Sequence, residues 1–382
     1  MWTAVSSGVL ALALVTQPVT TRACPNDNPG NSSPATSGDP LTTRDGVRLR
    51  VDTVLSGLEG VPWAMAFAPD GRLFVTERVG RVLIANVTAG TYDVALAMDD
   101  VWVNSEAGLL GLALDPQFAE TRFVYLYYSA RVGSAAVNRI VRYREVGGRL
   151  GERVVLLDNI PASQNHDGGR LKFGPDGLLY ATAGDAQAQG LAQDVSSLAG
   201  KILRITRDGT TPSGNRFSSP VFTYGHRNPQ GIDWHPGTGA MWASEHGNVG
   251  NDEINAIQSG LNFGWPRIEA SDTFPGMETP VTFFNPSIAP SGASFYRGTR
   301  FPQFANNFFV ATLRGTHLLR VTIDGSSRRI ASEERLLDGT HGRLRDVISG
   351  PDGNLYVCTN NRDGRGTPRS GDDRILRIAP AL

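Results

Sequence analysis

Residues 64–78 read AMAFAPDGRLFVTER: a short apolar segment, a Pro-Asp-Gly turn and a second segment of alternating apolar and polar residues. Proline presets φ for a turn, and Asp-Gly supplies the positive φ that a tight hairpin needs. The phrase returns with variations as LKFGPDGLLYATAGD from Leu171 and as DVISGPDGNLYVCTNN from Asp346. Each copy therefore predicts two antiparallel strands joined by a tight turn.

Three less regular copies complete the repeat. They are LALDPQFAETRFVYLYYSA from Leu112, GIDWHPGTGAMWASEHG from Gly231 and SGASFYRGTRFPQFANNFFVATLRG from Ser291. The copies follow one another at roughly 45 to 60 residues, a period typical of propeller blades. Six copies predict an all-β fold, a six-bladed β-propeller over residues 45–382, with no helix of useful length. Runs such as GKILRITRDG from Gly200 would supply the outer strands.

The composition fits a large, turn-rich domain. The chain has 382 residues, with 44 Gly, 23 Pro and a formal net charge of −1. Abundant Gly and Pro favour an all-β fold, and the near-neutral charge gives no electrostatic case for binding nucleic acid or an anionic membrane. Two cysteines, Cys24 and Cys358, are too few for a disulfide scaffold or a cysteine zinc cluster. Whether these two cysteines pair is left open.

The N-terminus reads as an export signal followed by a linker. The apolar run from Val9 to Val19 is too short to span a bilayer, and small residues follow it. Residues 1–23 are therefore predicted to be a signal peptide, which implies a periplasmic or secreted protein. Cys24 directly after Ala23 also permits a lipid anchor. Residues 24–44, rich in Asn, Ser, Gly and Pro, are predicted to form a disordered tether.

Two residues in loops before predicted inner strands could carry acid–base and electrostatic chemistry. His166 lies in QNHDGGR, and a histidine is well suited to accept a proton near neutral pH. Arg227 lies in GHRNPQG, and a guanidinium can stabilise a developing oxyanion or bind a carboxylate. The alternatives are a surface histidine and an arginine that pairs with an acid between blades.

A basic set lies further along the chain. In the phrase RLR, Arg343 and Arg345 share one face of an extended segment because side chains alternate along a strand. Together with Arg314 they could bind the carboxylates of a ligand. The alternative, favoured on spacing alone, is a solvated strand edge.

An oxygen-rich segment follows the fourth blade-like copy of the repeat. Glu245, Asn248, Asp252 and Glu253 surround Gly247 in EHGNVGNDE. Carboxylate, amide and backbone carbonyl oxygens on a Gly-bent loop suit a hard cation such as calcium, although the EF-hand spacing is absent. The alternative is a solvated turn.

Other chemistries have no support in the sequence. There is no Gly-rich loop between a strand and a helix for a nicotinamide or flavin, no G-x-S-x-G and no H-E-x-x-H. Five tryptophans are predicted to pack between blades: Trp63, Trp102, Trp234, Trp242 and Trp265.

Taken together, the motifs resemble those of the soluble quinoprotein glucose dehydrogenases, and more closely those of the related aldose sugar dehydrogenases. The matching phrases occur in family order over nearly all of the chain after the leader: PWAMAFAPDGRLFVTER, EAGLLGLALDPQF, NHDGGRLKFGPDGLLYATAGD, GKILRI, YGHRNPQGI, NDEINAIQSGLNFGWP, SIAPSGASFY and RLRDVISGPDG. The resemblance implies a six-bladed propeller that uses pyrroloquinoline quinone (PQQ) and calcium. It also implies oxidation of aldoses at C1 to lactones, with electrons passed to an external acceptor.

The resemblance implies a role for each matching residue. His166 matches the general base that takes the proton of the sugar C1 hydroxyl while the hydride moves to C5 of the quinone. Arg227 matches the residue that polarises the quinone carbonyl, and Asn228 matches a cofactor contact. Arg343 and Arg345 match the pair that binds the cofactor carboxylates.

The resemblance also implies two calcium sites. Gly247 and Asn248 match positions whose backbone carbonyls hold the calcium of the cofactor. Glu253 and the carbonyl of Phe263 match a second, structural calcium site.

Three further cofactor-binding positions depart from the glucose-dehydrogenase pattern. Glu106 stands where those enzymes have Gln and resembles the aldose-dehydrogenase variant, and Ser287 replaces a Thr. Arg314 replaces a Lys, which keeps the charge but changes reach and geometry. A Gln contact expected after Gly184-Asp185 is displaced by one residue or lost, because the chain reads Ala186-Gln187 there.

Two other functions remain open on the sequence alone. A non-catalytic propeller could bind a glycan or a protein partner, and the loss of His166 or Arg227 would favour that reading. A calcium-dependent lactonase would need side-chain carboxylates that converge on a central metal, whereas most of the acidic residues named above belong to one blade.

Overall fold

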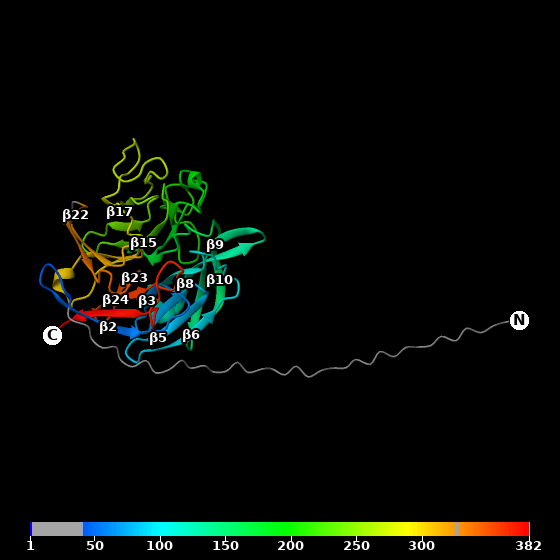
Figure 1. Ribbon diagram of the computed structural model, residues 1–382. Helices are drawn as coiled ribbons and strands as arrows, with labels where there is room; N and C mark the ends of the chain where they lie inside the picture. Colours follow the sequence, from blue (N-terminus) through cyan, green and yellow to red (C-terminus); the bar gives the residue numbers. More distant parts are fainter. Residues whose placement is uncertain (2–40, 325–327, 382) are drawn as a thin grey trace. The chain divides into compact units, whose positions relative to one another are not determined.

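The computed structural model describes Met1 and residues 41–324 and 328–381. These residues form six β-sheets arranged as a six-bladed β-propeller, which confirms the predicted fold (Figure 1). Apart from Met1, the predicted signal peptide lies outside the described residues, as do Cys24 with its possible anchor and residues 24–40 of the tether. In the part of the chain that is described, no helix has the length and apolar character needed to cross a membrane.

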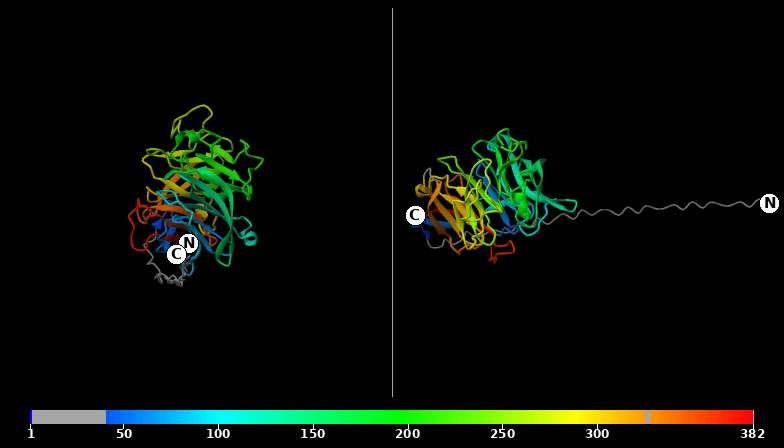
Figure 2. Two further views of the ribbon diagram at one scale, coloured as in Figure 1. Left: turned by 90° about the vertical axis from the view of Figure 1, so that its right-hand side faces the viewer. Right: turned by 90° about the horizontal axis from the view of Figure 1, so that it is seen from above.

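Five blades contain four antiparallel strands each, in order from the inner strand outward (Figures 1 and 2). Blade 1 contains β3 (Pro62–Phe67), β4 (Leu73–Glu77), β5 (Arg81–Asn86) and β6 (Thr91–Ala97). Blade 2 contains β7 (Leu109–Leu114), β8 (Phe123–Val132), β9 (Ala135–Val146) and β10 (Arg149–Pro161). Blade 3 contains β11 (Leu171–Phe173), β12 (Leu179–Ala183), β13 (Lys201–Ile205) and β14 (Val221–Tyr224).

The remaining blades follow in chain order. Blade 4 contains β15 (Pro229–Trp234), β16 (Met241–Glu245), β17 (Asp252–Ile257) and β18 (Thr282–Phe284). Blade 5 contains β19 (Pro290–Phe295), β20 (Phe308–Thr312), β21 (Leu318–Asp324) and β22 (Arg329–Leu336). Blade 6 contains β23 (Leu344–Ser349), β24 (Leu355–Thr359), β25 (Ile375–Pro380), β2 (Arg48–Leu55) and β1 (Leu41–Thr42). The described helical elements are α1 (Phe118–Thr121), η1 (Gln189–Ala192) and η2 (Pro302–Phe304).

Each copy of the sequence repeat forms the first two strands of one blade. The turn glycines Gly71, Gly177 and Gly353 have φ angles of 86°, 73° and 77°, a region that favours glycine. In the first copy Met65 pairs with Val75, and in the third Phe173 pairs with Leu179. Local turn chemistry therefore sets the register of these hairpins.

Blade 6 closes the ring because it combines both ends of the described chain. Strand β2 pairs with β25 along its length, and Figure 1 shows the blue and red strands side by side. The propeller begins earlier than predicted: Leu41 and Thr42, assigned to the tether, form β1 on the outer edge of blade 6. The physical reason is a tertiary contact, because Asp45 just after β1 makes a two-point ion pair with Arg320 on β21.

Asp45→Asn is expected to lower the free energy of unfolding by about 1 kcal/mol at neutral pH, since the pair is partly exposed. Hydrogen bonds from Arg320 lower the pKa of Asp45 from 3.8 to about 2. The folded-state pKa lies below the unfolded one, so this stabilisation is complete above the unfolded pKa and is lost as pH falls through the folded pKa. Urea unfolding at pH 7 and pH 3 should show the gap between wild type and variant narrowing at pH 3. A gap of equal size at both values would contradict the assignment.

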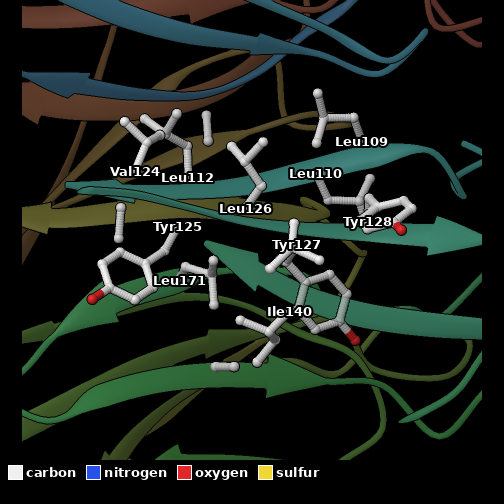
Figure 3. Close-up of a cluster of buried hydrophobic side chains, with 14 of the residues drawn as sticks. Leu109, Leu110, Leu112, Val124, Tyr125, Leu126, Tyr127, Tyr128, Ile140 and Leu171 are labelled. Carbon is white, nitrogen blue, oxygen red and sulfur yellow. The ribbon is translucent and has the colours of Figure 1, made fainter. Parts of the chain in front are cut away.

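The hydrophobic core is a ring of layers between neighbouring blades. One cluster joins blades 1 to 3, and others lie between blades 3 and 4, 4 and 5, 5 and 6, and 6 and 1. On β8, Figure 3 shows Val124, Leu126 and Tyr128 on one side of the strand and Tyr125 and Tyr127 on the other. Both faces of this strand are buried, so each blade is stabilised by apolar contacts with both of its neighbours.

This packing also fixes the loops at one end of the propeller. The segments that lead into the inner strands, residues 163–170, 225–228, 285–289 and 338–343, lie at the same end of their blades. The phenol of buried Tyr127 donates to the carbonyl of Asp167 at 3.0 Å, directly beside His166. Core packing in blade 2 therefore supports a site loop that leads into blade 3.

Candidate active site

His166 is oriented by a carboxylate. Its Nδ1 lies 2.8 Å from Oδ1 of Asp185, which follows β12 and is fully buried. A carboxylate accepts hydrogen bonds, so Nδ1 carries the hydrogen and Nε2 keeps its lone pair. The side chain of His166 is 18% exposed, so a substrate can reach it. The role of general base stays a prediction for His166.

Glycines let the two segments of this pair approach closely. A Cβ on Gly184 would lie 1.9 Å from the carbonyl oxygen of His166, so only glycine fits there. The amide of Gly168 donates to Oδ1 of Asn228 at 3.0 Å, and Asn228 is almost fully buried. Asn228, predicted as a cofactor contact, therefore also holds the His166 loop against blade 4.

Arg227 lies next to the carboxylate partner of His166, because its carbonyl accepts from the amide of Asp185 at 2.8 Å. Its side chain has no carboxylate partner among the described residues. Its Nη1 donates to the carbonyl of His246 at 3.3 Å, its Nε is buried without a hydrogen bond, and its guanidinium lies 5.4 Å from the ring centre of Trp265. Its backbone amide donates to Glu245. The backbone is thus fixed while the cationic group remains available to an anion.

Arg345 is a buried cation with neutral partners. It is 5% exposed, and it donates to Asn360 at 2.9 Å, Gln230 at 2.8 Å and Ser291 at 3.2 Å. No carboxylate in the described chain lies within ion-pair distance of it, and burial lowers its pKa to about 10. An unpaired buried charge is costly, so an anionic ligand at this place would compensate it. Arg343 differs, because its guanidinium already pairs with Asp363 at 2.6 Å.

Glu106 lies directly beside the backbone of the base. Its Oε2 accepts from the amide of His166 at 3.3 Å, and its Oε1 pairs with Nη1 of Arg365 at 2.6 Å. Burial acts to raise the pKa of Glu106, but the charges of His246 and Arg365 outweigh it and lower the pKa to about 2. Glu106 is therefore an ionised acceptor beside His166 at neutral pH.

His246 shows that these groups share one site. Burial lowers its pKa to about 4, the charges of Asp252 and Glu106 act to raise it, and those of Arg345 and Arg227 act to lower it. The imidazole is therefore neutral at pH 7. Groups from blades 2, 4 and 6 thus lie near His246, among them the predicted site residues Glu106, Arg227 and Arg345.

Ser287 and Arg314 lie together next to this centre. The hydroxyl of Ser287 donates to Oδ2 of Asp252 at 2.7 Å. The turn that carries Arg314 is tied to the Ser287 loop by the bond from Leu313 N to Ala289 O, at 2.9 Å. Arg314 itself is exposed, and its side chain makes no hydrogen bond or ion pair within the described residues. Among the predicted cofactor-binding residues in the described chain, Arg314 is therefore the one whose side chain the protein itself does not hold.

The predicted calcium ligands lie on two tight segments. The amide of Gly247 donates to Oδ1 of Asp252 at 2.9 Å, and the next residue, Asn248, is exposed. Where the structure is described, no group of three or more His, Cys, Asp or Glu side chains is placed to hold a metal ion. The predicted ligands at Gly247 and Asn248 are backbone carbonyls, so calcium there remains a prediction.

Glu253 has the chemistry of a cation ligand. Burial and the charge of Glu245 raise its pKa to about 8, and its oxygens accept only from Asn255 at 3.1 Å and Ala270 at 3.2 Å among the described residues. A nearby cation would favour its ionised form. The ring of Phe263, its predicted co-ligand through the carbonyl, stacks on His226 at 4.8 Å. The carboxylate of Glu253 has the oxygen chemistry that a hard cation prefers.

Several residues of the site were not predicted from the sequence. Trp265 was expected to pack between blades, but its Nε1 donates to Oδ2 of Asp185 at 2.8 Å. Arg78, with an unpartnered buried Nε, and Asp185 were not assigned roles. The sequence repeat could have indicated them, because the second strand of each copy ends at the same end of the propeller as the site. The residues just after those strands are site residues: Arg78, Asp185, His246 and Asn360.

Comparison with known proteins gives a consistent picture. Residues 60–376 match the family described as Glucose / Sorbosone dehydrogenase. The chain is 33% identical over 344 residues to aldose sugar dehydrogenase YliI of Escherichia coli strain K12, covering 84% of this chain and 90% of the relative. It is 26% identical over 405 residues to quinoprotein glucose dehydrogenase B of Acinetobacter calcoaceticus, covering 80% and 84%. The solved PQQ-bound form of aldose sugar dehydrogenase from Streptomyces coelicolor is 37% identical, with a TM-score of 0.79 over 87% of this chain and 98% of that chain.

The fold and the site define a six-bladed propeller in which the His166–Asp185 pair lies near arginines at one end of the blades. The family match covers most of the propeller. The chain therefore belongs to the glucose/sorbosone dehydrogenase family and is an oxidoreductase. The resemblance inferred from the sequence motifs is confirmed.

Proposed function

We propose that this protein is a PQQ-dependent aldose dehydrogenase that oxidises sugars at C1 to lactones. The observation that carries the proposal is the buried guanidinium of Arg345, satisfied only by neutral groups, in the same site as the His166–Asp185 pair. PQQ carries several carboxylates and would supply the missing negative charge. The names of the relatives support the sugar and the cofactor, since one is an aldose sugar dehydrogenase and a solved neighbour holds PQQ.

In this mechanism, bound PQQ supplies the hydride acceptor. Nε2 of His166 accepts the proton of the C1 hydroxyl, and Asp185 orients the imidazole and stabilises its charged form. The guanidinium of Arg227 stabilises negative charge that develops beside it, and it does so with a fixed backbone. Arg345 and Arg78 would hold the carboxylates of the cofactor. Glu106, which accepts from the amide of His166, would accept a hydrogen bond from a bound molecule.

The proposal also includes two calcium ions, an external electron acceptor and a location outside the cytoplasm. Gly247 and Asn248 would hold one calcium with the cofactor, and Glu253 with Phe263 would hold a second. Glu253 supports the second site, because its half-buried carboxylate accepts from only two donors among the described residues. Electrons would pass to a separate acceptor outside the cytoplasm, because the N-terminal sequence resembles an export signal.

The test is reconstitution of the purified protein. Addition of PQQ and calcium should produce glucose-dependent reduction of an artificial dye, and omission of either should abolish it. A panel of aldoses then gives the substrate range. No dye reduction with any aldose, together with no change in PQQ absorbance on mixing, would reject the proposal. That result would favour the binding propeller or the lactonase considered from the sequence.

A further inference from the structure

Trp265 contacts both the carboxylate partner of the base and the arginine beside it. Its indole Nε1 donates to Oδ2 of Asp185 at 2.8 Å, while Oδ1 of the same carboxylate holds Nδ1 of His166. The face of its ring lies under the guanidinium of Arg227, 5.4 Å from the ring centre. One side chain thus links the partner of the base to the group that stabilises negative charge.

Trp265 is itself fixed on both sides by its backbone. Its amide donates to the carbonyl of Gly225 at 3.0 Å, and its carbonyl accepts from Nε2 of Gln193 at 2.7 Å. The side chain is 6% exposed. The backbone is thus held on both sides of a buried indole whose only polar atom points at Asp185.

We propose that Trp265 is a positioning residue for proton transfer in this site. Its N–H fixes the rotation of the Asp185 carboxylate, which in turn keeps His166 in the Nδ1–H tautomer with Nε2 free to accept a proton. Its ring supports Arg227 through a cation–π contact. The inference rests on the proposed function, because it assigns Trp265 to the same proton transfer.

The carboxylate needs this second contact for a geometric reason. Asp185 Oδ1 is shared between His166 Nδ1 and the amide of Gln187, each at 2.8 Å. Rotation about the Cβ–Cγ bond would move both oxygens together, and those two bonds restrain it at Oδ1 only. The bond from Trp265 adds a restraint at Oδ2, so the carboxylate is held at both oxygens and His166 Nδ1 keeps a fixed acceptor.

The first test reads the tautomer directly in protein without cofactor. Long-range proton–nitrogen NMR on 15N-histidine-labelled protein should show His166 as the Nδ1–H tautomer in wild type. Trp265→Phe, which keeps an aromatic ring under Arg227 but removes the donor, should give a mixture of tautomers. Trp242→Phe, a buried tryptophan packed on Phe295 and Phe308, is the matched control and should leave His166 unchanged. An unchanged His166 tautomer in Trp265→Phe would overturn the proposal.

The second test is kinetic. Trp265→Phe should lower kcat by about 10- to 100-fold, the loss expected for one hydrogen bond to a charged group, with KM and the PQQ dissociation constant close to wild type. On the Asp185→Asn background, Trp265→Phe should add almost no further loss, because its effect acts through that carboxylate. Multiplied losses in the double variant, or a change confined to KM, would contradict the positioning role.

If Trp265→Phe does not fold, the hydrogen bond between Trp265 and Asp185 can be tested by changing Asp185 instead. With 15N-labelled indoles, the Nε1–H resonance of Trp265 should shift and exchange faster with solvent in Asp185→Ala, while the other tryptophans stay in place. An unchanged resonance would overturn the proposal. Failure of the proposed function would look different: wild type would not bind PQQ or reduce dye, whereas the two NMR measurements do not depend on cofactor.

Discussion

His166→Gln is expected to lower kcat with PQQ and glucose by roughly 10²–10⁴-fold, because it removes the general base. Glutamine can still accept a hydrogen bond, but it cannot take the proton of the C1 hydroxyl at neutral pH. The site around it should persist. The amide of His166, which donates to Glu106, belongs to the backbone and remains in the variant.

The binding of PQQ separates this effect from a general disruption. The dissociation constant for PQQ should stay near the wild-type value, since His166 makes no contact with the buried Arg345 in this structure. His341→Gln, in the 338–343 loop at the same end of the propeller, is the matched control and should retain wild-type kcat. Full activity of His166→Gln would show that another group accepts the proton.

Arg345→Ala is expected to weaken PQQ binding by roughly 10²–10³-fold, the loss typical of removing one partner of a buried charge pair. The reason is that Arg345 lies buried among neutral groups, with its charge uncompensated until an anion arrives. At saturating PQQ, kcat should recover a large part of its wild-type value. Titration of apo-protein with PQQ, followed by absorbance, gives the constant without any catalytic step.

Two further variants show whether the weaker PQQ binding of Arg345→Ala comes from the lost charge or from the lost donor geometry. Arg345→Lys keeps the charge but not the two-pronged donor geometry, so it should bind PQQ with intermediate affinity. Arg204→Ala is the control, because Arg204 on β13 contacts Asn215 and Asp176 away from the site. Equal affinity of Arg345→Ala and wild type would mean that the anion binds elsewhere, and Arg78 and Arg227, each half-buried with an unpartnered Nε, would then be the next candidates.

The site is built by convergence of loops from several blades rather than by one motif. The base and its carboxylate come from the two segments that flank the first hairpin of blade 3, Trp265 comes from blade 4, and Arg345 comes from blade 6. Arg365, between β24 and β25, reaches Glu106 before blade 2. Each contribution is a short loop or strand end, so the strands supply the rigidity that the chemistry requires.

The sequence by itself determined the hairpins and the number of blades, and it singled out His166 and Arg227 as candidate site residues. Pro-Asp-Gly turns and alternating strands act over a few residues, so their structure can be read locally. His166 and Arg227 were recognisable because each lies in a distinctive phrase next to a strand. Only the tertiary structure placed β1 in blade 6, paired Arg343 with Asp363 and brought the indole of Trp265 to Asp185. Trp265 and Asp185 are 80 residues apart, and a contact of that kind depends on how blades pack around the ring, which no local pattern encodes.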